Sequence, residues 1–273
     1  MKIALVTGCR TGIGRAVALR LARLGYHTYA GVRTDRDRQV LLGEHTRLRP
    51  IILDVIHSSH ILHTKQALEE YGRLDVLVNN AGVARVMPLE TAPTAAIQHH
   101  FAVNTIGALN ITQMALPFLR DARGQIINVS SMAGPVPYPF MGPYSASKAA
   151  LEALSSSLRQ ELRPWGIQVS IIRPGAVRTP ILAKGPAVVA AQLRHPDVEE
   201  LYGDALRAVE RFFSKVGGVP ATRVADVVER VVRARRPRFE YRVGPDAWVL
   251  LKLARLLPGR ILDELIRRQL RIP

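Results

Sequence analysis

The chain has 273 residues, 48% of them hydrophobic, and its 38 lysines and arginines outnumber its 22 acidic residues, which gives a net charge of +16. This length and composition suit one large domain with a buried core that needs neither metal nor disulfide for stability. The single cysteine, Cys9, excludes an internal disulfide. Because we find no run of 18 apolar residues and no basic leader before an apolar stretch, we expect no membrane-spanning helix, no signal peptide and a cytoplasmic protein.

Short β-branched runs alternate with longer helical patterns from the first residues onward. Strands are predicted at 2–7, 27–32, 51–54, 75–79, 125–129, 168–173 and 239–243. Helices are predicted between them at 13–24, 58–71, 94–121, 144–163 and 223–234. This alternation predicts a single α/β domain, a Rossmann-type doubly wound parallel sheet of about seven strands with helices on both faces. Ligands of such sheets bind beyond the carboxyl ends of the strands.

The first predicted strand runs into the glycine-rich segment TGCRTGIG at 7–14, which opens the first helical pattern. Gly8, Gly12 and Gly14 allow a tight turn, close approach of the backbone to a pyrophosphate, and packing of the helix on the strand. The helix N-terminus adds N–H donors and a positive dipole. The spacing is G-x-x-x-G-x-G instead of G-x-G-x-x-G, yet its place between strand and helix favours a dinucleotide site over a plain turn.

The end of the second predicted strand bears on the choice of dinucleotide. An NAD site usually places a carboxylate there for the ribose 2′-OH, whereas a cation accommodates the 2′-phosphate of NADP. No acidic residue stands near Gly31, and Arg33 follows two residues later. Arg10 in the glycine loop offers a second guanidinium, which donates hydrogen bonds in a planar fork. NADP is therefore the preferred cofactor, and Asp35 keeps NAD as the alternative.

The segment YSASK, residues 144–148, opens another predicted helix. Tyr144 and Lys148 are four residues apart, so their side chains project from one face. A free tyrosine, with a pKa of about 10, is a poor base at neutral pH, and a nearby ammonium group and an oxidised nicotinamide would both stabilise its phenolate. Alone, the segment also fits an ordinary solvated helix end.

The glycine loop is followed in order along the chain by NNAG at 79–82, SS at 130–131, YSASK at 144–148 and RPGAVRT at 173–179. With these motifs the chain resembles the short-chain dehydrogenase/reductase family over roughly residues 1–180. The resemblance implies an enzyme that transfers a hydride between a nicotinamide cofactor and a hydroxyl or carbonyl carbon. It also implies a homo-dimer or homo-tetramer built on the helices at 105–121 and 144–163.

The resemblance assigns four catalytic roles. Tyr144 is expected to be the general acid and base, and Lys148 to hold the nicotinamide ribose and lower the tyrosine pKa. Ser131 is expected to hydrogen-bond the substrate oxygen, as a donor to a developing alkoxide. It is preferred to Ser130 because it stands at the family's usual interval before the tyrosine. Asn104 is expected to anchor a water that relays protons to the lysine.

Further positions are assigned to the cofactor by the same resemblance. Asp54 is expected to contact the adenine, the segment 80–82 to back the ribose, and Thr179 to hold the carboxamide. Ser131 and Tyr144 are expected to bind the substrate. The cofactor-binding residues expected in full are Gly8, Arg10, Thr11, Gly12, Ile13, Gly14, Arg33, Asp54, Val55, Asn80, Ala81, Gly82, Tyr144, Lys148, Pro174, Gly175, Val177 and Thr179.

Two late segments lie outside these motifs. The block 180–220 is rich in proline and glycine around two helical pieces, which is typical of a substrate loop or lid. The C-terminal extension 245–273 carries two amphipathic patterns, at 248–257 and 261–270. From residue 230 onward the chain has 12 lysines and arginines against 4 acidic residues. We favour packing that closes a pocket, with peripheral contact to a membrane interface as the alternative.

Several features are given ordinary interpretations. His57, His60 and His63 recur in steps of three that spread around a helix, so we expect no metal site. Cys9 is expected to be a small packed side chain. No recognisable nucleic-acid module accompanies the positive charge, and we expect no nucleic-acid partner.

The apolar character of 181–193 and of the C-terminal extension favours a lipophilic small-molecule substrate, such as a steroid, retinoid or lipid alcohol or its ketone. One alternative is a reductase of 3-oxoacyl groups on an acidic acyl carrier, which a positive surface would attract. An alternative of another class is a non-catalytic dinucleotide sensor or nucleic-acid-binding protein. That alternative predicts the loss of Ser131, Tyr144 or Lys148, and all three are present.

Overall fold

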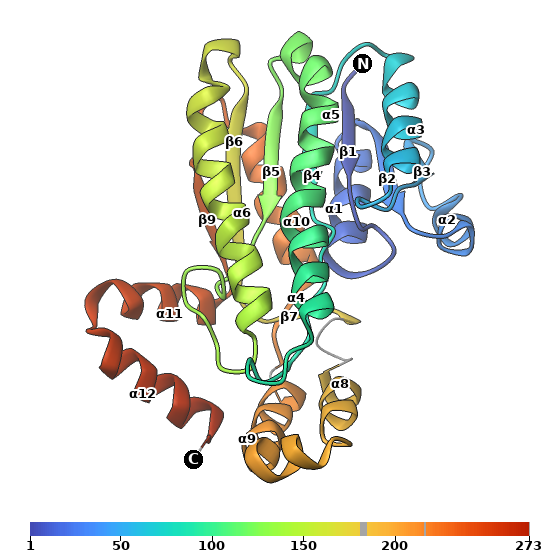
Figure 1. Ribbon diagram of the computed structural model, residues 1–273. Helices are drawn as coiled ribbons and strands as arrows, with labels where there is room; N and C mark the ends of the chain where they lie inside the picture. Colours follow the sequence, from blue (N-terminus) through green and yellow to red (C-terminus); the bar gives the residue numbers. More distant parts are fainter. Residues whose placement is uncertain (181–184, 216, 273) are drawn as a thin grey trace.

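The computed structural model describes residues 1–180, 185–215 and 217–272. Its centre is a parallel sheet of seven strands in the order β3-β2-β1-β4-β5-β6-β9 (Figure 1). The strands are β1 (Ile3–Val6), β2 (His27–Val32), β3 (Leu48–Ile52), β4 (Val76–Asn79), β5 (Gln125–Val129), β6 (Gln168–Pro174) and β9 (Glu240–Val243). The strand order reverses between β1 and β4, where such sheets bind their ligands. The predicted fold class is confirmed.

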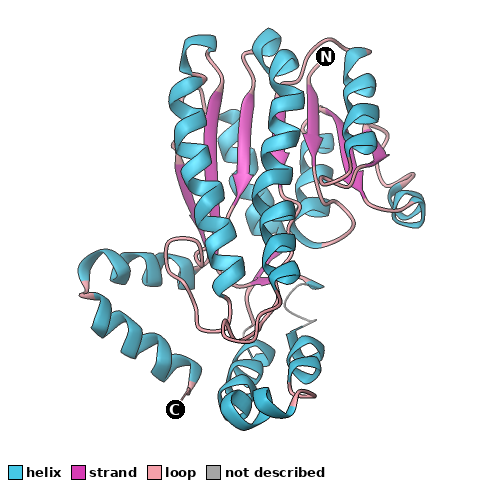
Figure 2. Cartoon of the chain, in the orientation of Figure 1, coloured by secondary structure: helices cyan, strands magenta, loops and turns pink. Residues whose placement is uncertain are grey.

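Helices cover both faces of the sheet (Figures 1 and 2). On one face, α1 (Gly12–Arg23) packs beside α10 (Ala221–Arg233), with an apolar cluster beneath them that includes Val17, Leu21 and Val228. The opposite face carries α3 (Ser58–Glu69), α5 (Gly107–Ala122) and α6 (Gly142–Glu161). Buried apolar clusters thus lie on both faces of the sheet, and their close packing positions the strand ends and the loops that follow them.

The third strand begins three residues earlier than the sequence predicts. β3 starts at Leu48 and contains Pro50, a residue that argues against a strand interior. It is tolerated because β3 lies at the edge of the sheet and pairs only with β2.

The short helix α2 (Asp35–Leu41) was not predicted, since seven residues are too few to show a helical period. Thr34 caps this helix by accepting a hydrogen bond from Asp37 N.

The predicted helix at 94–121 is interrupted. It consists of α4 (Thr94–Phe101), a π-helical turn η1 (Ala102–Ile106) and then α5. Asn104 lies in this turn and is fully buried. A π turn inserts one residue into the ladder of backbone hydrogen bonds and is often found at functional sites. Because the apolar pattern continues through it, periodicity alone gives no sign of the turn.

The substrate-loop region is closed at its base. β6 leads into β7 (Val177–Arg178), which pairs with β8 (Val219–Pro220) in a separate two-stranded ladder. Between them lie α8 (Gly185–Gln192) and α9 (Pro196–Lys215). Residues 181–184 and 216 of the predicted lid at 180–220 lie outside the described residues.

The C-terminal extension forms α11 (Pro245–Leu256) and α12 (Gly259–Leu270), which project from the body of the domain on the same side as α9 (Figure 1). A third apolar cluster joins these helices to α9 and to the segment after β5. Its buried members include Val136, Leu206, Val209, Leu250, Leu251, Ile266 and Leu270. This third cluster lies beyond the carboxyl ends of the strands, where the site is expected.

Candidate active site

The glycine loop is the point where three of the motifs meet. Gly8 and Gly12 have φ values of +71° and +61°, in the left-handed region that favours glycine. A Cβ at Gly8 would lie 2.9 Å from Ala81 Cα, and one at Gly12 would lie 2.9 Å from Thr179 Cγ2. Thr11 precedes α1 and makes no side-chain cap, which leaves the first N–H groups of the helix for an anion.

Asn80 shapes this loop. Its side-chain Nδ2 donates to the carbonyl oxygens of Thr7 (2.9 Å) and Gly8 (3.2 Å). The Thr7 hydroxyl in turn accepts from the backbone N–H groups of Asn80 and Ala81, at 3.0 and 2.9 Å. The NNAG segment is therefore locked against the glycine loop, and its side-chain amide serves the protein backbone.

The catalytic residues expected from the sequence lie together. Tyr144 and Lys148 occupy successive turns of α6, and the Lys148 ammonium, only 4% exposed, donates to Val129 O at 2.8 Å. Asn104 Nδ2 donates to Val83 O and to Ser147 Oγ, both at 2.9 Å. A Cβ at Gly82 would lie 3.3 Å from Asn104 Oδ1 and 3.6 Å from Lys148 Nζ. The absence of a side chain at residue 82 thus leaves room where Asn104 and Lys148 approach each other.

Ser131 and Tyr144 line a cavity of about 360 Å³ beyond the ends of β5 and β6. Its walls come from the segment after β5, from α9 and from both C-terminal helices. Apart from one carboxylate, at Asp246, the described lining is uncharged, and it includes Met132, Tyr138, Phe212, Phe213, Val249, Leu250, Leu253, Leu262, Leu265 and Ile266. The cavity also reaches the phosphate-loop side through Ile13 and Thr179, so cofactor and substrate would meet at Tyr144.

Comparison with known proteins identifies the family. The model of the short chain dehydrogenases matches residues 2–187. The chain belongs to the short-chain dehydrogenase family. It is similar to retinol dehydrogenase 5 of Mus musculus, with 34% identity over 96% of this chain and 86% of that protein. It is also similar to the NADPH-dependent 3-dehydrocapnine reductase of Ornithobacterium rhinotracheale, with 30% identity over 99% and 98% of the two chains.

Among solved structures, a short-chain dehydrogenase from Streptomyces avermitilis superposes with a TM-score of 0.77 and 29% identity, covering 99% of this chain and 94% of that one. The protein is accordingly an NAD(P)-dependent oxidoreductase that acts on a small-molecule substrate. The predicted family is confirmed.

Burial is the largest influence on the pKa values of Tyr144 and Lys148. It raises the pKa of the Tyr144 phenol above its ordinary value, against a smaller opposite effect of the hydrogen bond with Ser131. Burial also lowers the pKa of Lys148 to about 8, and the Glu152 carboxylate opposes that fall. In this structure the Tyr144 phenol is therefore a weaker acid than free tyrosine, so the phenolate expected from the sequence requires the positive charges of Lys148 and of an oxidised nicotinamide to outweigh burial.

Charged residues cluster at the expected adenosine end. Cys9 N donates to Gly31 O at 2.8 Å, which holds the glycine loop beside the end of β2. Arg10 Nε lies 3.0 Å from a carboxylate oxygen of Asp37, a residue that sequence reasoning missed. Arg33 is exposed and, among the described residues, makes no ion pair. Its charge is thus available to a ligand, whereas Arg10, itself 62% exposed, is paired with Asp37.

Asp35 is the carboxylate on which the alternative cofactor, NAD, rests. It lies on the exposed side of α2 with its carboxylate 2.8 Å from Arg38. Asp54 keeps its place after β3: its backbone N–H donates to His60 Nδ1 at 3.2 Å, so this histidine is used within the fold. Cys9 is fully buried, and burial raises the pKa of its thiol, as expected of a packed side chain.

The described residues contain no group of three histidines, cysteines or carboxylates that could hold a metal ion. None of the described helices combines the length and the apolar character needed to cross a bilayer.

Asp246, the carboxylate in the cavity, was not predicted either. It lies at the start of α11, and its Oδ2 accepts a hydrogen bond of 2.6 Å from Ala176 N. A side chain at Gly175 would collide with this carboxylate. Asp246 therefore fixes the loop after β6 against the C-terminal helix. The signal for it was the sequence Gly-Pro-Asp at 244–246, since proline and an acidic residue favour a helix start.

Proposed function

We propose that this short-chain dehydrogenase is an NADP(H)-preferring enzyme that transfers a hydride between nicotinamide and a hydroxyl or carbonyl carbon of a lipophilic substrate. The substrate class is a steroid, a retinoid or another lipid alcohol or ketone. The observation that carries this proposal is the cavity, in which Ser131 and Tyr144 lie in a mostly apolar lining. The bound nicotinamide would supply the hydride donor or acceptor.

Each catalytic side chain has one task in ketone reduction. Ser131 donates a hydrogen bond to the carbonyl oxygen and stabilises the negative charge that develops there. As the carbonyl carbon gains the hydride, its oxygen takes the proton of the Tyr144 hydroxyl, so the product is a neutral alcohol. Lys148, held on Val129 O at 2.8 Å, stabilises the phenolate that remains. Alcohol oxidation runs through the same groups in reverse.

The lining of the cavity supports the lipophilic substrate. The one carboxylate in the described lining, Asp246, accepts a hydrogen bond from Ala176 N, so its Oδ2 already has a partner within the protein. Aromatic and aliphatic side chains, many of them from α9, α11 and α12, form most of the described wall, which also includes the uncharged polar residues Ser130, Thr179 and Gln269. Transfer of an apolar substrate into such a chamber is favourable in proportion to the apolar area removed from water. The relative named retinol dehydrogenase 5 agrees with this substrate class.

The proposed substrate class is tested by a cofactor-absorbance assay. The panel contains steroids, retinoids, simple lipid alcohols, and 3-oxoacyl groups on a thioester or on an acidic carrier. We expect turnover of at least one lipophilic alcohol or ketone, and loss of that turnover in Tyr144→Phe. If the enzyme prefers the carrier-bound thioester and added salt weakens that preference, the substrate class is a 3-oxoacyl group instead of a lipophilic alcohol or ketone. Cofactor binding without turnover of any member would favour a dinucleotide sensor.

The preference for NADP rests on Arg33. Its guanidinium is exposed at the end of β2 and among the described residues has no carboxylate partner, and the relative from O. rhinotracheale is named NADPH-dependent. Arg33→Ala is expected to weaken NADP binding by about tenfold to a hundredfold, the size of a charge-assisted hydrogen bond, and to leave NAD binding within about threefold. Titration calorimetry with both dinucleotides measures this.

Arg36→Ala is the matched control, because Arg36 is an exposed arginine on the neighbouring helix and should leave both affinities unchanged. Equal losses for NADP and NAD in Arg33→Ala would contradict a contact with the 2′-phosphate.

Two partner assignments stay predictions. Trp248, Lys252, Arg255 and Leu256 are exposed on α11, an apolar and basic face that suits an anionic membrane interface. Failure to sediment with phosphatidylglycerol vesicles at low salt would count against that contact.

A homo-dimer or homo-tetramer through α5 and α6 is expected by resemblance, and a monomeric mass in solution would exclude it.

A further inference from the structure

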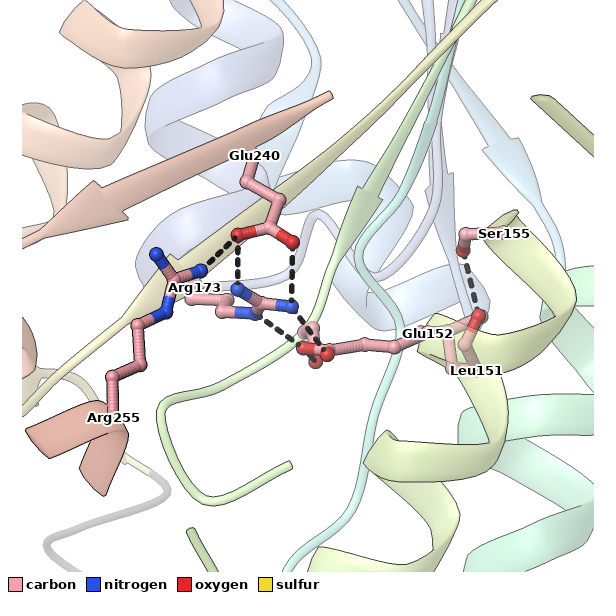
Figure 3. Close-up of polar contacts among 7 residues, drawn as sticks. Leu151, Glu152, Ser155, Arg173, Glu240 and Arg255 are labelled. Carbon is pink, nitrogen blue, oxygen red and sulfur yellow. Dashed lines mark hydrogen bonds and ion pairs between the residues drawn. The ribbon is translucent and has the colours of Figure 1, made fainter. Parts of the chain in front are cut away.

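A buried group of charges lies one helical turn beyond Lys148. Glu152 follows Lys148 by four residues on α6 and therefore lies on the same face. Its carboxylate accepts hydrogen bonds from Arg173 Nε at 2.9 Å and Arg173 Nη2 at 2.8 Å, an arrangement that uses both carboxylate oxygens (Figure 3). Arg173 belongs to β6 and is 8% exposed. A bidentate pair of this kind is both strong and geometrically specific.

The same guanidinium binds a second carboxylate. Arg173 donates through Nη1 and Nη2 to Glu240 of β9, at 2.5 and 3.2 Å. Arg255 of α11 approaches Glu240 from the solvent side at 3.6 Å (Figure 3). Arg173 thus lies between two glutamates, and the cluster ties α6 to β6, β9 and the C-terminal helix.

Glu152 also holds the segment that carries Ser131. Its Oε1 accepts a hydrogen bond of 2.7 Å from Ser130 Oγ, the residue directly before Ser131. A Cβ at Gly134 would lie 3.2 Å from that same oxygen, so the segment after β5 rests against the carboxylate. Besides the backbone hydrogen bonds from Ser130 N to Ile172 O and from Met132 N to Pro174 O, the segment that carries Ser131 is thus tied to one side chain of the helix that carries Tyr144.

The charge of the cluster matters as well. The groups that face Glu152 are Ser130, Arg173 and, along its own helix, Lys148; Glu240 and Arg255 lie behind Arg173. With Arg255 included, the two glutamates and two arginines sum to zero, and Glu152 is the member on the same helix face as Lys148. The side chains of Glu152 and Arg173 are 12% and 10% exposed, so water screens the Glu152 carboxylate poorly. Glu152 raises the pKa of Lys148 against the effect of burial.

We propose that Glu152 is a positioning residue for hydride transfer, which holds the Ser130–Ser131 segment against Tyr144 and keeps a negative charge beside Lys148. This inference rests on the proposed function. A buried ion pair is costly unless it is well hydrogen-bonded, and an apolar pair of similar volume often serves stability as well or better. The task at the site explains why charges stand here.

Glu152→Gln separates charge from shape, and its readout is the pH profile of kcat/KM for ketone reduction. Reduction requires the proton of Tyr144 and the ammonium of Lys148, so activity falls at high pH when this pair loses its first proton. Replacing a carboxylate by a neutral amide lowers the pKa of both groups. We expect the basic limb to move to lower pH by about one unit and kcat to fall about tenfold.

Glu152→Asp and Ser130→Ala complete the set. The aspartate variant keeps the charge but shortens the reach to Ser130, and Ser130→Ala removes the hydrogen bond but keeps the carboxylate. Both are expected to lower kcat about fivefold or more with the basic limb within about 0.3 units of the parent. Glu161→Gln, an exposed change at the end of α6, is the control and should match the parent.

An unmoved basic limb in Glu152→Gln would overturn the charge role, and full kcat in Ser130→Ala would overturn the positioning role. If Glu152→Gln fails to fold, Glu152→Asp and Ser130→Ala still decide the second point, and a large limb shift in Glu152→Asp would refute the first. Turnover at the parent rate in Tyr144→Phe would instead show that the proposed function has failed.

Discussion

Tyr144→Phe is expected to lower kcat by about 10²- to 10⁴-fold in both alcohol oxidation and ketone reduction, which is the usual contribution of a general acid or base. The phenyl ring keeps the packing of the tyrosine, which lines the cavity beside Ser131, and removes the hydroxyl that carries the transferred proton. NADP affinity should stay within about threefold, because the hydroxyl acts in the transition state. Steady-state cofactor absorbance and a binding titration measure the two quantities.

Tyr138→Phe is the matched control. Tyr138 is 7% exposed and lines the same cavity, so this variant also removes one phenol hydroxyl from the chamber. It is expected to keep kcat within about tenfold of the parent, since Tyr138 has no partner on the reaction path. Equal losses in the two variants would mean that the Tyr144 hydroxyl is one polar group of the pocket among others, and the assignment of the acid and base would be wrong.

Lys148→Met is expected to have the second largest effect, a fall in kcat/KM of about 10²-fold or more at pH 7. Methionine keeps most of the volume of the lysine and removes the charge that stabilises the phenolate. Without that charge the pKa of Tyr144 rises in the cofactor complex. The acidic limb of the alcohol-oxidation profile, which reports formation of the phenolate, should therefore move to higher pH, and activity should partly return in alkaline buffer.

Lys65→Met on α3 removes an exposed lysine and should leave the profile of the parent unchanged. A uniform loss of activity in Lys148→Met, with the acidic limb in its original place, would show that Lys148 only binds the cofactor ribose. Weaker cofactor binding is expected alongside the shift in either case, so the profile is the quantity that decides.

Much of the fold follows from the sequence because strands and their loops are local features. Each central strand is a short apolar run bounded by turn residues, and the glycine loop needs its glycines at 8 and 12, where φ is positive. The edge strand β3 begins at Leu48, earlier than predicted, and includes Pro50, which an edge strand tolerates. The π turn at Asn104 was missed because the apolar period continues through it.

The charges around the site could not be predicted, for a different reason. Glu152 meets Arg173 and Arg173 meets Glu240 across 21 and 67 residues of chain, so no spacing rule links them. Asp246 reaches Ala176 across 70 residues. A motif records the residues that a ligand demands, whereas these partners are set by which strand ends lie side by side in the sheet.

The apolar pattern of the C-terminal extension predicted its helices but not their orientation. Its two amphipathic helices were predicted, and pocket closure was favoured over membrane contact. The structure places Val249 and Leu265 in the cavity lining while both remain partly exposed, at 59% and 42%. The pattern identified helices with one apolar face, but only the fold shows that this face turns toward Tyr144.

The central claim is that nicotinamide and Lys148 together make the Tyr144 phenol easy to ionise. The most direct test is an ultraviolet titration of tyrosinate in the parent and in Tyr144→Phe, each with and without NADP⁺. In the free protein burial raises the pKa of Tyr144, so the extra phenolate of the parent should form above the ordinary tyrosine range. With NADP⁺ it should form well below that range. Formation at the same pH in both states would contradict the account.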